Sequence, residues 1–472
     1  MKYRTEHGHF WDPEHPDRKI PGEFRFDEDG VSLTLFDALR EFVFPEHEVV
    51  DGTPKWVTIP VIHGELHGAT REAVSLLAST GLDLAGPYGE VTETYRGQVA
   101  VLGGHVAADL FEWCACQFDA LPAWVNPPPT TDLREGEATV RTKTLALDSV
   151  TIDGVEVTLV AAPHVSLQPV AGDFSVTQTI EFRLVGPATA VRELVDTRIR
   201  SLHNLLTVAV GLPIRLTKLE VAETRDTPLR LEVLFASTQA ARSRELLPST
   251  ARNYDSSMLA GHEDLPLSLL TKWAVQEDED DDCIMLLCSP FFAPFMYVEN
   301  KYANTYQSAE SMAADRHGGR EMDRAAHRER MARIEDALTQ AGISDDEIAR
   351  VKRLTNRNDK TQVQLLTEWI ESCGDVGEAV LAAVPNFAQL AASARVSVSH
   401  GGAARFDSLT KHWLTEVLRF LVRYRLLLEM GVAEDHLTRR IVKNPQFTRP
   451  LKELAVLGAS VLATDSGAVE PE

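Results

Sequence analysis

The sequence lacks the features of a membrane protein and of a disulfide-rich secreted protein. No stretch of its 472 residues approaches the roughly 18 consecutive apolar residues that a membrane-spanning helix requires. The N-terminal segment is polar and has no apolar core of a secretory signal. The five cysteines are odd in number and irregularly spaced, which argues against a disulfide framework and fits a reducing compartment. We therefore expect a cytoplasmic protein that has no membrane partner.

The sequence also lacks an excess of basic residues. It has 47 Lys and Arg against 70 Asp and Glu, for a formal net charge of −23. A surface of that sign repels polyanions at long range, although a local basic patch can still bind phosphate. The six consecutive acids at 277–282 are most simply a solvated loop. Composition thus neither supports nor excludes an RNA partner.

Short strand patterns dominate the first half of the chain. Residues 22–36 alternate apolar and polar side chains around an Asp-Gly turn, which predicts a β-hairpin, and Asp153-Gly154 marks a second turn. Further strand patterns lie at 57–62, 94–104, 110–118, 138–147, 150–162, 175–185, 214–221 and 229–235, and a helical period occupies 188–210. We predict a β-rich N-terminal region with packed helices over residues 1–240.

Helical patterns replace the strand patterns from about residue 262. They occupy 265–276, 283–314 with breaks near Pro290 and Pro294, 320–341, 345–357, 362–372, 377–398 and 411–431. The length of the chain also favours more than one hydrophobic core. We expect an α+β protein in which an all-α helical bundle spans residues 262–455 and a disordered tail spans 460–472.

One short stretch concentrates the chemistry. Arg395 and His400 lie five residues apart at the predicted end of an apolar helix, which two glycines stop. A histidine with a near-neutral pKa can move a proton when a ribose 2′-hydroxyl attacks the adjacent phosphorus. A guanidinium can neutralise the negative charge of the resulting transition state. The spacing alone is a weak signal, and the plainer interpretation is a histidine that interacts favourably with the helix dipole.

The surrounding sequence resembles a known family. The stretch from Arg395 to Val432 resembles the HEPN domain of the ApeA-like family, in which a helix ending in Arg-x4-His precedes a polar loop and a long apolar helix. Ala309-Glu310 matches the end of that domain's opening helix. Gly8-His9-Phe10-Trp11 and Ile20-Pro21-Gly22 match hallmarks of the ApeA N-terminal domain. The resemblance covers roughly residues 7–240 and 262–435.

The resemblance implies an anti-phage, abortive-infection-type endoribonuclease that needs no metal and no cofactor. It implies catalytic roles for Arg395 and His400, an RNA substrate, a homodimer or higher oligomer with two Arg/His pairs in one cleft, and a trigger that could be a phage-derived protein. Val396 departs from the polar residue, typically Asn, that follows the motif arginine. An inert HEPN dimer that acts as a sensor or binding module is therefore the alternative.

The dimer hypothesis draws on one further segment. The helix predicted at 411–431 carries a long apolar face that suits either an interface or a core. Its members are Trp413, Leu414, Val417, Phe420, Leu421, Tyr424 and Leu428.

Other residue groups have competing interpretations. Four arginines recur at every fourth position and could bind RNA, although a solvated helix face is the simpler explanation because acids are interspersed. They are Arg316, Arg320, Arg324 and Arg328. His63 and His67 flank Glu65, and Cys114 lies near Cys116, yet neither group shows the further ligands that a metal needs. We predict no metal site, and we expect Trp113, Trp124 and Phe118 to be core residues.

Overall fold

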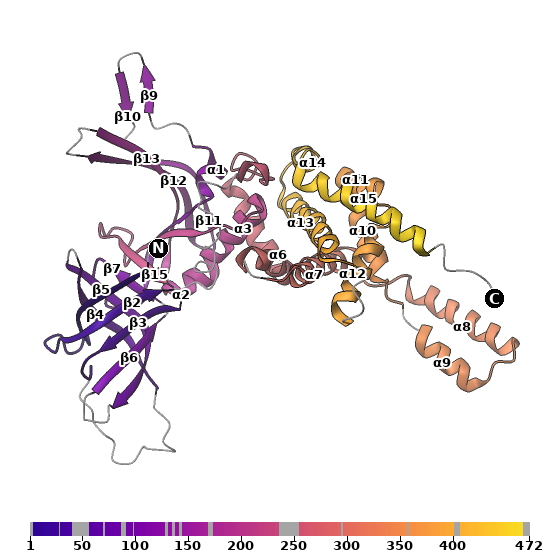
Figure 1. Cartoon of the computed structure of the whole chain (residues 1–472), viewed down its shortest axis with the longest axis horizontal. Coiled ribbons are helices and arrows are strands. Elements are labelled where there is room, and N and C mark those ends of the chain that lie inside the picture. The colour runs from indigo at the N-terminus through magenta and orange to yellow at the C-terminus, as the bar shows by residue number, and fades with distance from the viewer. Residues whose placement is uncertain are drawn as a thin grey trace. The chain divides into compact units, whose positions relative to one another are not determined.

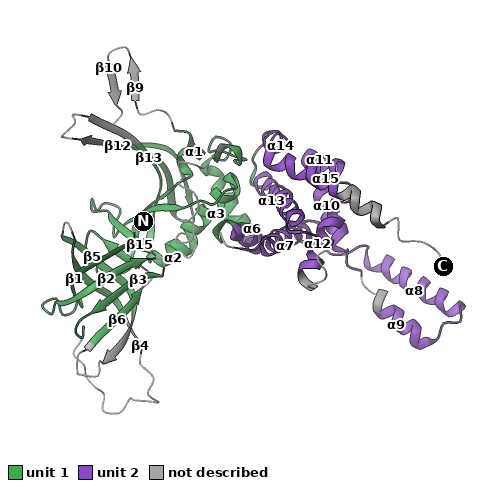
Figure 2. Ribbon diagram, in the orientation of Figure 1, with its two compact units in different colours: residues 1–277, 291–294, 430–432 green, residues 278–290, 295–429, 433–472 purple. Residues whose placement is uncertain are grey.

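The computed structural model describes most of the chain in two compact units. The described residues are 3–27, 29–39, 56–68, 71–85, 91–97, 99–127, 131–134, 137–140, 144–168, 173–235, 254–293, 296–355, 358–400 and 406–465. The first unit contains residues 1–277, 291–294 and 430–432, and the second contains 278–290, 295–429 and 433–472 (Figure 2). The first is rich in strands and the second is helical (Figure 1), which confirms the predicted α+β class.

The strands of the first unit include all of the predicted strand patterns, and three more at 4–11, 71–85 and 131–134 that were not predicted. They are β1 (Arg4–Trp11), β2 (Ile20–Asp27), β3 (Gly30–Leu35), β4 (Trp56–His67), β5 (Arg71–Ala85), β6 (Val91–Gly97), β7 (Val99–Leu102), β8 (Phe111–Phe118), β9 (Thr131–Arg134), β10 (Glu137–Val140), β11 (Leu145–Ile152), β12 (Val155–Gln168), β13 (Asp173–Thr189), β14 (Leu216–Ala222) and β15 (Leu231–Phe235). Both predicted hairpins form, β2 with β3 and β11 with β12. Asp153 and Gly154 have positive φ angles of 49° and 77°, as a tight two-residue turn requires.

Six strands of the first unit close into a ring. The order β5-β4-β1-β2-β3-β6 returns to β5 through a β5–β6 pairing, and all of these pairs are antiparallel. Phe10, Phe24 and Leu33 are fully buried inside the ring. Gly8 and Gly22 are glycines for a steric reason, because a Cβ would lie 2.4 Å from the Glu65 carbonyl oxygen and 2.6 Å from that of Thr34. The hallmark glycines thus permit close packing of neighbouring strands.

The remaining strands of the main sheet continue from β5 in the order β7-β15-β14-β8-β13-β12-β11, and β9 and β10 form a separate two-stranded sheet. The helical segment predicted at 188–210 forms α2 (Val191–Leu194), a π-helical turn (Val195–Ile199) and α3 (Arg200–Val210). A short helix, α1 (Leu121–Val125), follows β8. Trp113, Trp124 and Phe118 are buried in this unit, as predicted.

The structure divides the chain later than the sequence patterns suggested. Residues 262–277, assigned from their helical period to the second domain, belong to the first unit as a 3-10 turn (Leu267–Leu269) and most of α5 (Leu270–Glu279). The Leu267 amide donates to the Asp148 carboxylate at 2.7 Å, and the Trp273 indole donates to the Ser201 carbonyl at 3.1 Å. These contacts hold the segment against β11 and α3.

The second unit consists of helices. They are α6 (Asp281–Phe292), α7 (Val298–His317), α8 (Arg324–Gln340), α9 (Asp345–Thr355), α10 (Gln362–Glu371), α11 (Gly374–Ala383), α12 (Phe387–His400), α13 (Ser408–Met430), α14 (Glu434–Val442) and α15 (Pro445–Asp465). The segment predicted as one pattern at 377–398 is two helices that break at Val384 and Pro385, because proline cannot donate within a helix. The acidic run is not a loop, since it ends α5 and begins α6. Its acids at the start of α6 interact favourably with the helix dipole.

The C-terminal end of the second unit also differs from the prediction. Helix α15 extends through Asp465, so residues 460–465, which we had assigned to the tail, are helical. Alanine and leucine in this segment favour a helix. Residues 466–472 lie outside the described residues.

Within the described residues, none of the helices is both long and apolar enough to cross a membrane alone. The pair α11 and α12, bent by 76°, passes that test only when the two are taken together, by length and composition.

Candidate functional site

Arg395 and His400 both lie on α12, and the helix ends at His400 as predicted. The chain enters α12 after Pro385, with the Leu390 amide donating to the Asn386 carbonyl at 3.0 Å. Arg395 is half-buried, whereas the neighbouring Val396 is 52% exposed. The motif arginine therefore lies at the border between the packed face of α12 and its surface. The side chain of His400 and residues 401–405 lie outside the described part of the chain.

Helix α7 packs against α12 close to the motif. The buried Tyr302 on α7 donates a hydrogen bond of 2.5 Å to the carbonyl oxygen of Ala391, one turn before Arg395. Ala391 and Ala394 are fully buried, and their small side chains allow the two helices to approach closely. Tyr306 lies one turn further along α7, with its ring centroid 6.0 Å from that of Tyr302. Tyr302 thus anchors the turn of α12 that precedes Arg395.

The charge of Arg395 acts on both of these tyrosines. Burial raises the pKa of Tyr302 and of Tyr306 well above the usual tyrosine value, and the positive charge of Arg395 opposes that rise. Both phenols therefore stay neutral at physiological pH, so they can donate hydrogen bonds but cannot act as bases. Sequence reasoning missed their role, although their i, i+4 spacing in the predicted opening helix was a visible signal.

Glu310, also on α7, accepts a hydrogen bond of 2.6 Å from the side chain of Gln362 on α10. The Ala309-Glu310 pair thus lies about two turns before the end of α7, and its glutamate takes part in the contact between these two helices.

The four arginines singled out by their spacing do not form one stripe. Arg316 belongs to α7, Arg320 lies in the turn after Gly318 and Gly319, and Arg324 begins α8, which also carries Arg328. The helical period that suggested a common face is interrupted by the two glycines. Arg324 and Arg328 are exposed on α8, which with α9 forms a helical hairpin extending from the rest of the second unit (Figures 1 and 2). The four arginines therefore do not share one helix face, and the simpler interpretation of a solvated face fits Arg324 and Arg328.

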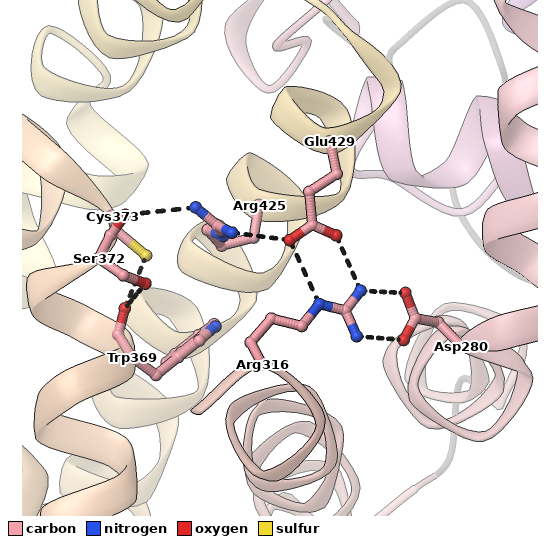
Figure 3. Close-up of polar contacts among 7 residues, drawn as sticks. All are labelled: Asp280, Arg316, Trp369, Ser372, Cys373, Arg425 and Glu429. Atoms are coloured by element: carbon pink, nitrogen blue, oxygen red, sulfur yellow. Dashed lines mark hydrogen bonds and ion pairs between the residues drawn. The ribbon is translucent and has the colours of Figure 1, made fainter. Parts of the chain in front are cut away.

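Arg316 has a structural role in the second unit (Figure 3). Its guanidinium donates to both carboxylate oxygens of Asp280, at 2.8 and 2.5 Å, and to Glu429 on α13. These acceptors raise the pKa of Arg316. Glu429 also accepts from Arg425 at 2.7 Å, and Arg425 donates to the Ser372 carbonyl at 3.2 Å. Arg316 therefore joins α7 to α13 and to Asp280, the residue just before α6, and its donors are directed at protein carboxylates rather than at phosphate.

The predicted metal candidates separate in the structure. The His63 imidazole lies 2.9 Å from the Val106 carbonyl oxygen, whereas His67 lies against His9. Cys114 and Cys116 are buried, and burial raises the pKa of the Cys114 thiol to about 12. Within the described residues, no group of three or more His, Cys, Asp or Glu side chains is arranged to hold a metal ion.

The apolar face of the helix predicted at 411–431 lies mostly inside the protein. This helix is α13, and five of the seven residues named for its face are 0% exposed: Leu414, Val417, Phe420, Leu421 and Tyr424. Trp413 and Leu428 are half-buried. Of the two interpretations of this face, the structure supports core packing for these five residues.

A strand-rich unit is followed by a helical unit in which Arg-x4-His ends one helix, the order of parts that the resemblance to ApeA-like HEPN proteins predicted. The family model described as ApeA N-terminal domain 1 matches residues 5–273, and the model described as Apea-like HEPN matches residues 303–436. Because the first match covers more than half of the chain, the protein belongs to the ApeA family, as its resemblance predicted. Comparison with curated proteins and with solved structures found no match.

Proposed function

We propose that this protein is an anti-phage defence endoribonuclease whose HEPN domain cleaves RNA without a metal ion. The observation that carries the proposal is the Arg395/His400 pair on the last two turns of α12, within the region matched by the HEPN model. HEPN domains are typically ribonucleases of defence systems. The proposal assigns RNA as the substrate and a phage-derived protein as the trigger.

The proposed reaction is an internal transphosphorylation. The 2′-oxygen forms a bond to the adjacent phosphorus, and the bond from phosphorus to the 5′-oxygen of the next nucleotide breaks. His400 transfers a proton at one of these oxygens, and Arg395 stabilises the extra negative charge on the phosphoryl oxygens. The products are a 2′,3′-cyclic phosphate and a 5′-hydroxyl.

The surroundings of Arg395 support this role. Its helix is held to α7 by the bond from Tyr302 to Ala391, so the backbone from which the guanidinium extends has a defined position. The phenols nearby are neutral at physiological pH, so they do not form an ion pair with the guanidinium.

We further propose that two copies combine to form the active site. One chain supplies a single Arg395/His400 pair, whereas transphosphorylation benefits from separate acid and base groups on opposite sides of the phosphorus. A twofold axis beside the end of α12 would bring in the second histidine. Val396, which is 52% exposed next to Arg395, offers apolar surface at that position.

A second candidate function is a HEPN dimer that acts as a sensor or binding module without catalysis. The observation that favours it is also Val396, because an apolar residue follows the motif arginine where a polar one is typical. Under this hypothesis the protein would protect cells by binding alone.

The deciding experiment uses the full chain in two assays, phage protection in cells and cleavage of end-labelled RNA in cells under infection. We expect both to be lost in Arg395→Ala and His400→Ala and kept in Arg324→Ala, an exposed arginine of α8 that serves as the matched control. Cleavage should persist in lysates with excess EDTA and leave cyclic phosphate ends. Full protection by a folded Arg395→Ala/His400→Ala double variant would reject catalysis and favour the binding module.

A further inference from the structure

Histidines gather on the outer face of the six-stranded ring in the first unit. Strands β1 and β4 pair antiparallel, with Gly8 opposite Leu66 and His9 opposite Glu65. Alternate residues of a strand point to opposite faces. Leu66 is fully buried, so His9, Glu65 and His67 point outward, where His9 and Glu65 are half-exposed and His67 is exposed.

Two of these imidazoles face each other at close range. His9 Nδ1 lies 3.2 Å from His67 Nε2, and the ring centroids are 4.8 Å apart. His67 is the diagonal neighbour of His9 across the two strands, two residues beyond Glu65, a spacing that long side chains can bridge. Two zinc–nitrogen bonds of about 2.0–2.1 Å that meet at a tetrahedral angle place their nitrogens roughly 3.3–3.4 Å apart. The observed separation is close to that value.

In a neighbouring histidine pair on the same face, the ring nitrogens do not face each other. His63 and His105 stack with their ring centroids 4.7 Å apart, but His63 Nε2 lies 2.9 Å from the Val106 carbonyl oxygen and His105 Nε2 lies 3.0 Å from that of Gly64. These nitrogens donate to carbonyl oxygens, and the rings pack on one another. The nitrogens of His9 and His67 instead meet each other at an exposed position.

We infer that His9 and His67 form a binding site for a divalent transition-metal ion such as Zn²⁺, with Glu65 as the third ligand. Imidazole nitrogens favour zinc, copper or nickel over magnesium and calcium, which take oxygen ligands. Without metal, one of the two facing nitrogens must carry a proton to hydrogen-bond the other. When a metal binds, the proton of that ring moves to its other nitrogen, and both facing nitrogens then offer a lone pair.

Glu65 must change its partner to become a ligand. Its carboxylate lies 3.7 Å from the Lys19 ammonium, and both side chains are substantially exposed, at 37% and 45%. An exposed ion pair of this length contributes little stability, so moving Glu65 toward the histidines costs little. Within the described residues no three such side chains are already arranged to hold a metal ion, so the site requires this movement of Glu65. Solvent or a partner molecule would occupy the fourth position.

The site belongs to the first unit, whereas the proposed catalytic helix belongs to the second, and its role differs from catalysis. A bound ion would tie β1 to β4 at the outer face and stabilise the fold of the N-terminal domain, since a ligand that binds only the folded state raises its stability. The proposal does not depend on ribonuclease activity. RNA cleavage can remain independent of metal while the N-terminal domain binds it.

The test measures Zn²⁺ binding to the purified, metal-free full chain by competition with a chromophoric chelator, together with thermal unfolding. We expect one Zn²⁺ per chain and a rise in melting temperature. His9→Ala and His67→Ala should each weaken Zn²⁺ binding by about tenfold or more, because the loss of even an outer-shell partner of a metal ligand lowers metal affinity by that factor. Each should also abolish the rise in melting temperature. Glu65→Gln should weaken Zn²⁺ binding less. Cu²⁺ added instead should show nitrogen hyperfine structure from two imidazoles by electron paramagnetic resonance.

The control is His105→Ala, which removes an imidazole of the same face whose nitrogen donates to a carbonyl, and it should keep the wild-type affinity. Circular dichroism establishes that each variant is folded. Equal Zn²⁺ affinity in wild type and in a folded His9→Ala/His67→Ala double variant would overturn the proposal, as would a loss of affinity in His105→Ala as large as that in His9→Ala.

Discussion

The guanidinium of Arg316 and the carboxylate of Asp280 face each other through two parallel hydrogen bonds, with the Asp280 side chain fully buried (Figure 3). Two-point pairs of this kind fix orientation as well as distance. Glu429 accepts from the same guanidinium, so two acids on two other segments share one arginine from α7.

We predict that Asp280→Asn destabilises the protein by about 2–4 kcal/mol. The amide would leave Arg316 partly unpaired in a buried place, and breaking one side of such a pair is costly. Urea unfolding at pH 7 measures the difference. Arg330→Met, which removes an exposed ion pair with Glu321, is the control and should change stability by less than about 1 kcal/mol. A change in Asp280→Asn no larger than this control would show that the pair contributes little.

We predict that mixing two inactive variants restores part of the proposed ribonuclease activity. If each cleft takes catalytic groups from two chains, Arg395→Ala and His400→Ala chains should complement each other in mixed dimers. The assay is RNA cleavage after the variants are co-expressed, and light scattering gives the oligomeric state. A monomer of 52.2 kDa at micromolar concentration, or no recovery in proven mixed dimers, would contradict the composite site.

We predict that Tyr302→Phe lowers RNA cleavage about fivefold through the position of Arg395. Losing the hydrogen bond to the Ala391 carbonyl removes about 1 kcal/mol of stabilisation at the turn before the motif. If the transition state loses the same 1 kcal/mol of stabilisation, the rate falls about fivefold. The effect should fall on kcat rather than on KM. Tyr297→Phe is the control, because that ring is 77% exposed. Equal rates for the two variants would remove Tyr302 from the proposed mechanism.

We predict that His203 makes the stability of the first unit depend on pH between about 4 and 6.5. Burial lowers the pKa of His203 to about 4, although its Nε2 lies 2.7 Å from the Ile214 carbonyl oxygen. The unfolded chain, with a normal histidine pKa, therefore binds more protons across this window, and stability falls as pH falls. Across this pH range, His203 alone lowers the free energy of unfolding by about 3 kcal/mol.

The measurement for His203 is the free energy of unfolding at several pH values for wild type and for His203→Gln, whose amide can still donate to Ile214. The difference between the two profiles isolates His203 from the carboxylates. The wild type should lose more stability than the variant as pH falls from 6.5 to 4. Parallel profiles would show that His203 is not the group responsible.

We predict that none of the five cysteines reacts with a thiol reagent in the folded protein at pH 8. All five are buried, and burial raises the pKa of Cys114, Cys283 and Cys373 to about 12. The thiolate is the reactive form, and it is nearly absent at that pH. Five thiols should react in denaturant, which is the control. Rapid reaction of even one thiol in the native state would refute the prediction.

Local patterns in the sequence were sufficient for much of this protein. The alternation at 22–36 predicted the hairpin of β2 and β3 because alternate residues of a strand face opposite sides. The Arg-x4-His stretch predicted a helix that ends at His400, and the hallmark motifs identified the family and the order of its domains. Each of these inferences depends on residues close together in the chain.

Spatial partners were decided by the tertiary structure alone. Arg316 appeared to continue a stripe with Arg320, yet its partners are Asp280 and Glu429, which are distant in sequence. His67 appeared to pair with His63, but strand pairing brings it to His9. Periodicity describes which face of an element a side chain occupies. It contains no information about which other element packs on that face, because that choice depends on the packing of the whole unit.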